Sequence, residues 1–309
     1  MQRYNAFGPY MRKKFALKVY KVNVDAGFTC PNRDGTLGVS GCIYCNNDSF
    51  RPTSCKPALS ITAQVSNGIL HTKKRYKAEK FLVYFQAYTN TYAPIAELEK
   101  MYHEALCHPD VMGLAIGTRP DSVDEEKIAM LQELASRYFI LIEYGLQSIY
   151  DKSLEYINRG HNYQAFLDAI EMTKNRNIAI GAHLIAGFPT ETREEMLAMA
   201  DMISRLPIQF LKVHQLQIVR ETPLAGIYQQ SPFHTFEYRE YIEFISDFIE
   251  RTSPEIVFQR LFATAPDDIL MAPAWGRNRH QILLDIEKNL DLRDTHQGKK
   301  FEFASTNTR

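Results

Sequence analysis

The chain has 309 residues, of which 45% are hydrophobic and 23% charged, and its 36 Lys and Arg residues balance its 36 Asp and Glu residues. These values are ordinary for a soluble globular protein and exclude a disordered or collagen-like chain. No apolar run approaches the roughly 20 residues of a membrane-spanning helix, and the N-terminus has no signal-peptide core. We therefore expect a reduced, cytoplasmic protein whose five cysteines are candidate ligands rather than disulfide partners.

Strands and helices are predicted to alternate along most of the chain. Runs rich in β-branched and aromatic residues predict strands at 19–24, 81–86, 112–117, 138–143, 178–186 and 210–219, with a short one near Val257. The segments between them predict helices at 60–76, 94–107, 122–137, 163–176, 192–205 and 235–252. We expect Ser60 to cap one helix and Ser122, with Glu125, to form a capping box. The polar tail after about Lys288 is expected to fray.

This alternation predicts an α/β fold with a parallel sheet, arranged as an incomplete (β/α)6 TIM-like barrel. We expect a basic N-terminal extension at 1–18, the barrel at 19–260, and a C-terminal extension at 261–309 that packs on the barrel. A parallel barrel presents its site at the carboxyl ends of its strands. The most informative polar and glycine residues of the sequence fall at such ends.

The balanced net charge conceals an uneven distribution. Residues 1–100 contain 15 Lys and Arg against 6 Asp and Glu, a net charge of +9, and the remaining residues carry the opposite net charge. A basic third of a chain fits the binding of phosphates, as in nucleic acids. It also fits solvated helix faces that pair with acids elsewhere, so charge alone leaves both alternatives open.

One glycine-rich loop after the first predicted strand concentrates the cysteines. Cys30, Cys42 and Cys45 fall within 16 residues, in a loop with four glycines. Thiolates at such short spacing select zinc or an iron–sulfur cluster. Three cysteines on a four-iron cluster would leave one iron without a protein ligand, where a substrate or cofactor could bind.

Zinc is the competing interpretation of the same loop. Cys55 would be a fourth ligand and would close a tetrahedral structural site, with 11, 2 and 9 residues between successive cysteines. A redox pair at Cys42 and Cys45 is a third interpretation, although a thioredoxin-type motif needs no third cysteine. The spacing by itself leaves zinc and cluster equally open.

The cysteine loop resembles that of the radical S-adenosylmethionine (SAM) enzymes. The long first gap is similar to the variant found in the elongator catalytic subunit, and Tyr44 before the third cysteine also matches. Seven stretches in order resemble the YhcC/YtqA-type subgroup: 27–36, 84–88, 116–121, 143–148, 158–161, 184–192 and 213–217. The resemblance spans roughly residues 19 to 275 and favours the cluster over zinc.

This resemblance implies the cofactors and the chemistry. Cys30, Cys42 and Cys45 would hold a [4Fe–4S] cluster, and SAM would bind its open iron through amino and carboxylate groups. Reductive cleavage of SAM would yield a 5′-deoxyadenosyl radical, with the electron supplied by an external one-electron reductant of flavodoxin or ferredoxin type. Cys55 and Cys107 match no ligand position of the family.

The resemblance also implies which residues bind SAM. Arg159, 12 residues after Gln147 as in the similar oxygen-independent coproporphyrinogen oxidases, would bind the carboxylate. Gln147 would bind the ribose hydroxyls, Tyr44 would lie along the adenine, and Gly187 would line the adenine pocket. Glu143 would take the sulfonium or amino group.

The chain departs from the family at one of these contacts. Many members carry Gly-Gly-Glu at the end of the second strand, whereas this chain has Gln86 there, and Gln86 would substitute for that contact. Salt bridges remain the alternative for two of the charged residues: one at a helix end for Arg159, and one at the barrel rim for Glu143.

The mouth of the predicted barrel carries aromatic and polar residues. Tyr88, Asn90, His214 and Gln217 are the substrate-facing candidates, and their side chains are suited to stacking and hydrogen bonding with a base. His214 alternates with apolar neighbours on a strand, so it should face into the barrel. A histidine that is simply satisfied in the interior is the alternative.

Three functions follow from these observations. The first is a radical SAM enzyme that modifies tRNA, on a base of the anticodon loop. The second is a radical SAM oxidoreductase acting on a small metabolite. The third is a non-catalytic zinc-binding interaction module. Salt-sensitive tRNA binding separates the first from the second, and iron content separates both from the third.

Overall fold

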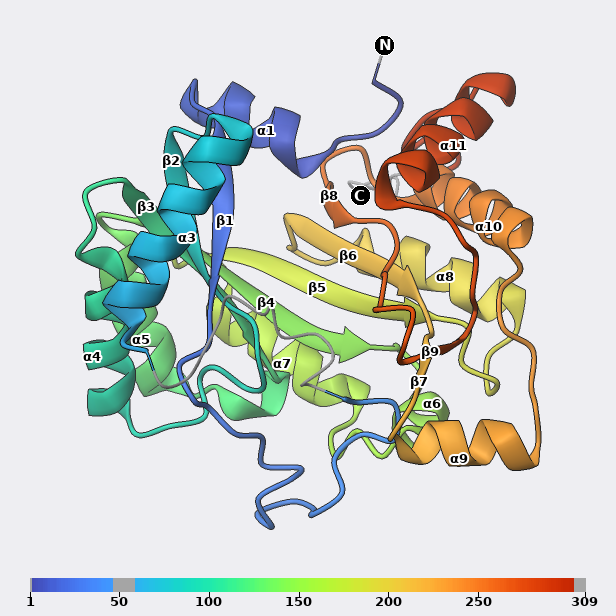
Figure 1. Cartoon of the computed structure of the whole chain (residues 1–309), viewed down its shortest axis with the longest axis horizontal. Helices are drawn as coiled ribbons and strands as arrows, with labels where there is room; N and C mark the ends of the chain where they lie inside the picture. Colours follow the sequence, from blue (N-terminus) through green and yellow to red (C-terminus); the bar gives the residue numbers. More distant parts are fainter. Residues whose placement is uncertain (1, 47–58, 303–309) are drawn as a thin grey trace, which may run out of the picture.

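A seven-stranded parallel sheet forms the centre of the molecule (Figure 1). The computed structural model describes residues 2–46 and 59–302. The strands lie in the order β1 (Val19–Val24), β2 (Lys80–Phe85), β3 (Val111–Thr118), β4 (Phe139–Gln147), β5 (Ala179–Ala186), β6 (Phe210–Gln215) and β8 (Val257–Arg260). Because β1 and β8 are the edges of the sheet, the barrel is incomplete. The predicted fold is confirmed, and the short strand near Val257 is its seventh strand.

Helices cover the outer face of this sheet (Figure 1). They are α3 (Ile61–Tyr76), α4 (Ile95–Leu106), α5 (Glu125–Ala135), α7 (Tyr163–Thr173), α8 (Arg193–Ile203) and α10 (Tyr238–Arg251). The strands are buried on both faces, which explains their nearly continuous apolar sequences. Ser60 accepts a hydrogen bond from the Ala63 amide at 3.2 Å, so the cap predicted for α3 is confirmed. In the described ranges, no helix is long and apolar enough to cross a membrane.

A helix that the sequence analysis did not predict, α1 (Phe7–Phe15), closes the amino end of the barrel. The rings of Phe7 and Tyr10 pack edge-on against Phe210, at 5.7 and 5.5 Å between centroids. Met11 is fully buried in the same region. The early Pro9 is compatible with a helix because it lies in the first turn, where its missing amide hydrogen is not needed.

The prediction of a frayed tail after Lys288 is wrong for the residues described. Helix α11 (Arg279–Leu292) packs along α10, and the chain beyond it is held by a buried glutamine. Gln297 donates to the Ser253 and Ile256 carbonyls at 2.6 and 2.8 Å and accepts from the Asn5 amide at 2.7 Å. Hydrogen bonds therefore connect the tail to the N-terminal segment at Asn5 and to the segment between α10 and β8. The polar composition of the tail did not reveal these contacts.

Local boundaries differ from prediction at three places. Ser122 ends a short 3-10 turn, and Asp124 caps α5 by accepting from the Lys127 amide at 2.9 Å. The strand expected at 210–219 ends at Gln215, and Ile218–Val219 (β7) pairs instead with Leu270–Ala272 (β9). Two short helices were missed, α6 (Asp151–Tyr156) and α9 (Pro223–Gln230), although Thr222 before Pro223 is a recognisable start signal.

Replacing Gly113 by alanine is expected to destabilise the sheet. An added Cβ would lie 1.9 Å from the Phe139 carbonyl oxygen, so the backbones of β3 and β4 would have to separate. We expect a loss of about 3 kcal/mol of unfolding free energy, the upper part of the range for overpacking. The matched control is Gly226→Ala in α9, where an added Cβ meets nothing within 4 Å. Urea unfolding checks the prediction, and equal midpoints for Gly113→Ala and wild type would contradict it.

Candidate active site

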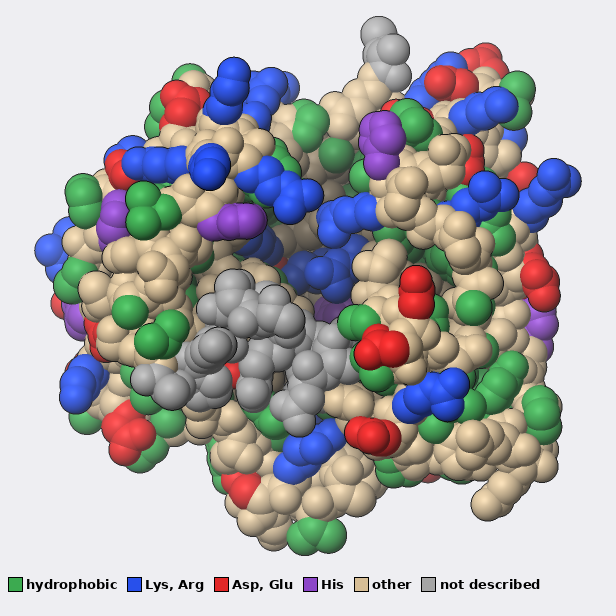
Figure 2. Space-filling view, viewed as in Figure 1, with side chains coloured by type: hydrophobic (Ala, Val, Ile, Leu, Met, Phe, Trp, Pro, Cys, Tyr) green, Lys and Arg blue, Asp and Glu red, His purple; other side chains and the backbone are tan. Residues whose placement is uncertain are grey.

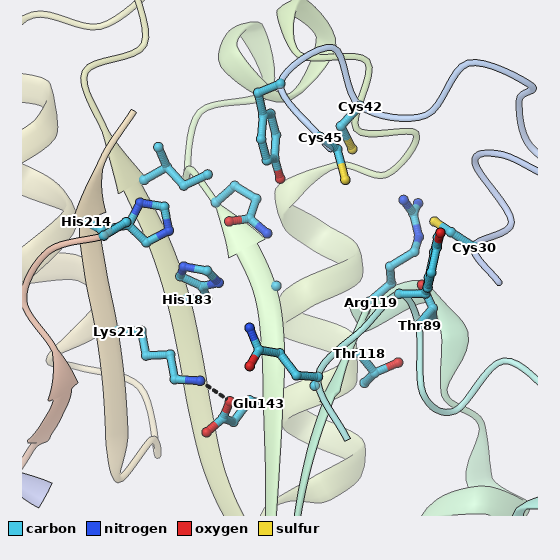
Figure 3. Close-up of a pocket in the computed structure, with 18 of the residues that line it drawn as sticks. Cys30, Cys42, Cys45, Thr89, Thr118, Arg119, Glu143, His183, Lys212 and His214 are labelled. Atoms are coloured by element: carbon cyan, nitrogen blue, oxygen red, sulfur yellow. Dashed lines mark hydrogen bonds and ion pairs between the residues drawn. The ribbon is translucent and has the colours of Figure 1, made fainter. Parts of the chain in front are cut away.

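All three cysteines of the glycine-rich loop line one cavity at the carboxyl ends of the strands. The cavity has a volume of about 220 Å³. Backbone hydrogen bonds shape the loop: the Gly41 amide donates to the Asn32 carbonyl at 2.7 Å, and Gly41 adopts a positive φ of 72°. Figure 3 shows Cys42 and Cys45 next to each other, with Cys30 below them on the same side of the cavity.

The Cys42 thiol lies beside a buried cation. Arg159 Nη1 approaches the Cys42 sulfur at 3.5 Å, and the Asn32 amide approaches it at 3.7 Å. Burial, followed by the charge of Cys42, raises the pKa of Cys45 to about 11. A cation and an amide directed at sulfur stabilise a thiolate, which is the form that binds metals.

The described thiols do not by themselves form a site for a single metal ion. Among the described residues, no three His, Cys, Asp or Glu side chains converge closely enough to hold one metal ion. A tetrahedral zinc site brings all its ligands to one atom, whereas a four-iron cluster binds each thiolate through a different iron. Cys55, the fourth ligand of the zinc alternative, lies outside the described residues.

Unpartnered polar atoms surround the cavity beside the cysteines. Gln147 Oε1, Arg159 Nε, His183 Nε2 and Gln217 Oε1 are buried and have no hydrogen-bond partner among the described residues. Buried polar atoms are normally paired, and exceptions occur where a ligand binds. The cavity is therefore suited to a polar ligand of the size of a nucleoside.

Arg159 and Gln147 meet over Gly145 near the end of β4. Arg159 Nη2 donates to the Gly145 carbonyl at 2.5 Å, and Gln147 adopts a positive φ of 77°. A Cβ on Gly145 would lie 2.9 Å from both side chains, so the glycine permits their approach. Burial opposes the charge of Arg159, but Cys42 and Tyr44 raise its pKa above the usual value. The helix-end salt bridge considered for Arg159 is not formed with any described residue.

Three further candidates line the cavity. Tyr44 lies between Cys42 and Cys45 in the chain, and its ring contacts Phe188 at 6.3 Å between centroids. Gln86 follows β2, and Tyr88 adopts a positive φ of 64° beyond it. The structure thus brings all three to the cysteine cavity, as the sequence analysis expected.

Glu143 faces the cavity but is already paired. Its two oxygens accept from Lys21, at 2.5 Å, and from Lys212, while Lys212 also donates to the Tyr84 hydroxyl and Lys21 to Gln259. Burial alone would raise its pKa, but the two lysines lower it below the usual range. This ion pair lies inside the barrel rather than at its rim, and it leaves neither oxygen free for the expected contact with SAM.

The buried Lys212 gives the fold a pH dependence. Burial, partly offset by Glu143, lowers its pKa from 10.5 to about 7. The unfolded chain therefore binds an additional proton between these two pH values, and the fold gains stability as pH rises, at most about 1.4 kcal/mol per unit. We expect wild type to gain stability relative to Lys212→Met from pH 7 to pH 9. Urea unfolding at several pH values checks this, and a constant difference would contradict it.

Two histidines form the wall of the cavity opposite the cysteines (Figure 3). The rings of His183 and His214 lie 4.7 Å apart, and His214 Nδ1 donates to the Gln215 carbonyl at 2.8 Å. Burial lowers the pKa of His214 to about 4 and also lowers that of His183, so both rings are neutral near pH 7. His214 and Gln217 thus face the cavity, as expected of substrate-facing residues.

Two of the expected site residues do not line the cavity. Asn90 is buried behind the cavity, where its amide donates to the Gly117 carbonyl at 2.7 Å and its own carbonyl accepts from Tyr102. Gly187 also lies outside the cavity lining, with a positive φ of 104° and an edge of Phe236 within 3.2 Å of where a Cβ would be. Sequence position near a strand end did not reveal the direction of either residue.

The cavity residues that the sequence analysis missed include three that can carry a charge: His183, Lys212 and Arg260. A signal was present for one of them, Lys212. Lys212 and His214 are two residues apart in β6, so they share one face of an otherwise apolar strand. Such polar residues in a buried strand indicate an inward-facing site.

A wider hollow lies along the open edge of the barrel between β1 and β8, and we call it the basic groove. It has a volume of about 970 Å³, and its described lining contains no Asp or Glu. Its Lys and Arg residues are Arg12, Lys13, Lys18, Lys21, Lys212, Arg260 and Arg279. Figure 2 shows Lys and Arg side chains around and inside the central hollow of this face.

Two family models match the chain. The model of the radical SAM superfamily matches residues 30–203, and that of the radical SAM C-terminal domain matches residues 208–291. Protein YtqA of Bacillus subtilis is 30% identical, over 97% of this chain and 94% of that protein. Protein YhcC of Escherichia coli K12 is 32% identical, over 93% and 92%. The resemblance noted in the sequence is confirmed.

The chain is also similar, at lower sequence identity, to a further protein sequence and to a solved structure. The tRNA uridine(34) acetyltransferase of Methanocaldococcus jannaschii is 27% identical over 44% of this chain and 25% of that protein. The solved structure of an N-terminally truncated Elp3 from Methanocaldococcus infernus superposes with a TM-score of 0.69 at 17% identity. It covers 90% of this chain and 64% of that one, and it confirms the fold.

Proposed function

The chain belongs to the radical SAM superfamily and is an enzyme of that class, and from this premise we propose that its substrate is tRNA, modified on a base of the anticodon loop. Its cofactors are a [4Fe–4S] cluster and SAM, which the superfamily has in common.

The observation that carries the proposal is the continuity of the cysteine cavity with the basic groove. Four residues line both: Tyr84, Gln86, Lys212 and Arg260. A cleft with cations and no acids along its described lining attracts phosphates. The partial similarity to a tRNA uridine(34) acetyltransferase supports the same substrate class. An anionic polymer in the groove would thus reach the cavity.

The residues around the cavity fit the cofactors. We propose that Cys30, Cys42 and Cys45 hold the cluster. Arg159 would pair its free Nε and an Nη with the carboxylate of SAM, and Gln147 would accept from a ribose hydroxyl through its unpartnered oxygen.

Aromatic and amide groups complete this site. Tyr44 would lie along the adenine, and Gln86 remains the candidate for the amino group. This proposal assigns no contact with SAM to the paired Glu143, to the buried Asn90, or to Gly187, which lies outside the cavity lining.

The protein's own contribution to the reaction is positioning and exclusion of water. When bound, the cluster supplies one electron, received from an external reductant, that cleaves SAM and generates the radical. The neutral rings of His183 and His214 offer nitrogen acceptors that do not repel a cation. Tyr88 and Gln217 would stack on and hydrogen-bond the base that reaches the cavity.

The test is an anaerobic assay with the reconstituted protein, SAM and a reductant. We expect total tRNA lacking the modification to raise 5′-deoxyadenosine formation, and mass spectrometry of digested tRNA to show one nucleoside of changed mass. The same tRNA digested with nuclease beforehand is the control. Stimulation by a small-metabolite extract but not by tRNA would contradict the proposal and favour the oxidoreductase alternative.

A further inference from the structure

The junction between the cavity and the basic groove holds an unusual charge. Arg260 is the last residue of β8 and lines both spaces. Its guanidinium is half-buried and has no hydrogen-bond or ion-pair partner among the described residues. A guanidinium has five donors, so a half-buried one without an acceptor is poorly satisfied.

The surroundings of Arg260 make this charge costly. Lys21, Lys212 and Arg279 line the same groove, and burial, with a smaller contribution from the charge of Arg260, lowers the pKa of each. Glu143 is the acidic residue beside these cations, and its two oxygens already accept hydrogen bonds from Lys21 and Lys212. The junction therefore has an excess of positive charge that an incoming anion would neutralise.

The outer wall of the groove continues the same charge. Arg12 and Lys13 are exposed on α1, and their side chains have no partner among the residues that the structure describes. The Lys18 ammonium donates to the Tyr76 carbonyl, while the Lys18 backbone amide donates to Glu79. The Lys and Arg residues of the groove therefore extend from Arg12 and Lys13 at the surface to Arg260. Arg260 also lines the cavity that holds the histidines and cysteines.

We propose that Arg260 binds a phosphate group of the substrate, next to the nucleoside that enters the cavity. A guanidinium binds two phosphate oxygens at once, which fixes orientation as well as position. Arg12 and Lys13 bind neighbouring phosphates farther out. This inference rests on the proposed function for its source of phosphate, a nucleic acid, while the subsite itself also accepts the phosphate of a free nucleotide.

The test measures binding of tRNA by fluorescence anisotropy over a range of salt concentrations. For Arg260→Gln we expect a Kd increase of roughly tenfold or more at fixed salt. The slope of log K against log salt should fall by about 0.7 to 0.9 for the lost contact. Arg260→Lys keeps the charge without the fork and should retain part of the affinity. The matched control, Arg137→Gln, removes an exposed arginine outside the groove and should change neither quantity.

A second variant and a folding control accompany Arg260→Gln. Arg12→Gln, at an exposed position, should lower the slope of log K against log salt by a similar amount without disturbing the fold. Urea unfolding verifies that Arg260→Gln is folded.

A second arm of the test compares the binding of uridine 5′-monophosphate with that of uridine. The nucleotide should bind more tightly than the nucleoside in wild type, and the difference should disappear in Arg260→Gln.

The outcomes separate this inference from the proposed function. If tRNA binds and Arg260→Gln has the wild-type Kd and slope, the phosphate subsite is overturned while the tRNA substrate stands. If wild type does not bind tRNA but prefers the nucleotide through Arg260, the subsite stands and serves a small substrate. If neither tRNA nor nucleotide depends on Arg260, the subsite is overturned.

Discussion

Replacing Cys42 by alanine is expected to abolish SAM cleavage. Cys42 is buried and close to Arg159, and it is one of the three thiols that line the cavity. With two thiolates left, a four-iron cluster would lose one of its three protein ligands, and the electron needed for cleavage would have no carrier. We expect loss of the visible iron–sulfur absorption, an iron content far below four per chain, and no 5′-deoxyadenosine above background.

The matched control for this prediction is Cys107→Ala. Cys107 is an exposed cysteine at the end of α4, where its thiol donates to the His103 carbonyl, far from the cavity lining. It should retain iron, colour and product. A Cys42→Ala protein that keeps its iron and makes 5′-deoxyadenosine would contradict the assignment of this residue as a ligand. A wild-type protein that binds one zinc and no iron would contradict the cluster in all three positions.

Replacing Glu143 by glutamine is expected to cause the largest loss of stability among the single substitutions considered. Glutamine keeps the shape, but it leaves Lys21 and Lys212 buried without a counter-charge. Removing one partner of a buried ion pair costs about 3–5 kcal/mol. We expect a loss of this size in urea unfolding near pH 6. The loss should shrink at higher pH, where the lysines lose their protons.

Lys212→Met is the matched control for Glu143→Gln. It removes one of the two cations and leaves Glu143 paired with Lys21 at 2.5 Å, so the loss should be clearly smaller. Combining the two substitutions should recover part of the stability lost in Glu143→Gln, because only one unpaired lysine remains. Additive losses in the double variant would show that the two residues do not interact, contrary to the structure.

Much of the fold could be predicted from local patterns. Buried parallel strands are apolar on both faces and alternate with amphipathic helices, so the barrel was legible from the sequence. Helix α1 was not, because its apolar residues Phe7, Tyr10 and Met11 form too short a pattern beside a basic run. Its stability comes from packing against Phe210 and Phe139, which lie some 130 to 200 residues away in the chain. The tail held by Gln297 is a similar case, since its partners lie in other elements.

The candidate site, like the fold, has features that the sequence predicted and features that depend on tertiary neighbours. Cysteine spacing and residue type indicated a metal-binding loop, because metal chemistry selects thiolates at short spacing, and the resemblance to the radical SAM enzymes favoured a cluster over zinc. The resemblance implied Arg159 and Gln147 as candidates, and alternation along a strand indicated His214; all three line the cavity. The directions of Asn90 and Gly187 and the pairing of Glu143 depend on neighbours from other strands, and no local pattern carries that information.

By itself the sequence indicated a metal-binding loop, the class of fold and an unequal distribution of charge, through three cysteines in one loop and a periodic succession of strands and helices. Its resemblance to a known family implied the chemistry. Only the tertiary structure decided where that charge acts. Arg12, Lys21, Lys212, Arg260 and Arg279 come from five elements, and they meet because the sheet stays open between β1 and β8. The physical reason is that electrostatic attraction depends on distance in space, so cations far apart in the chain become one anion-binding groove only after the strands are ordered side by side.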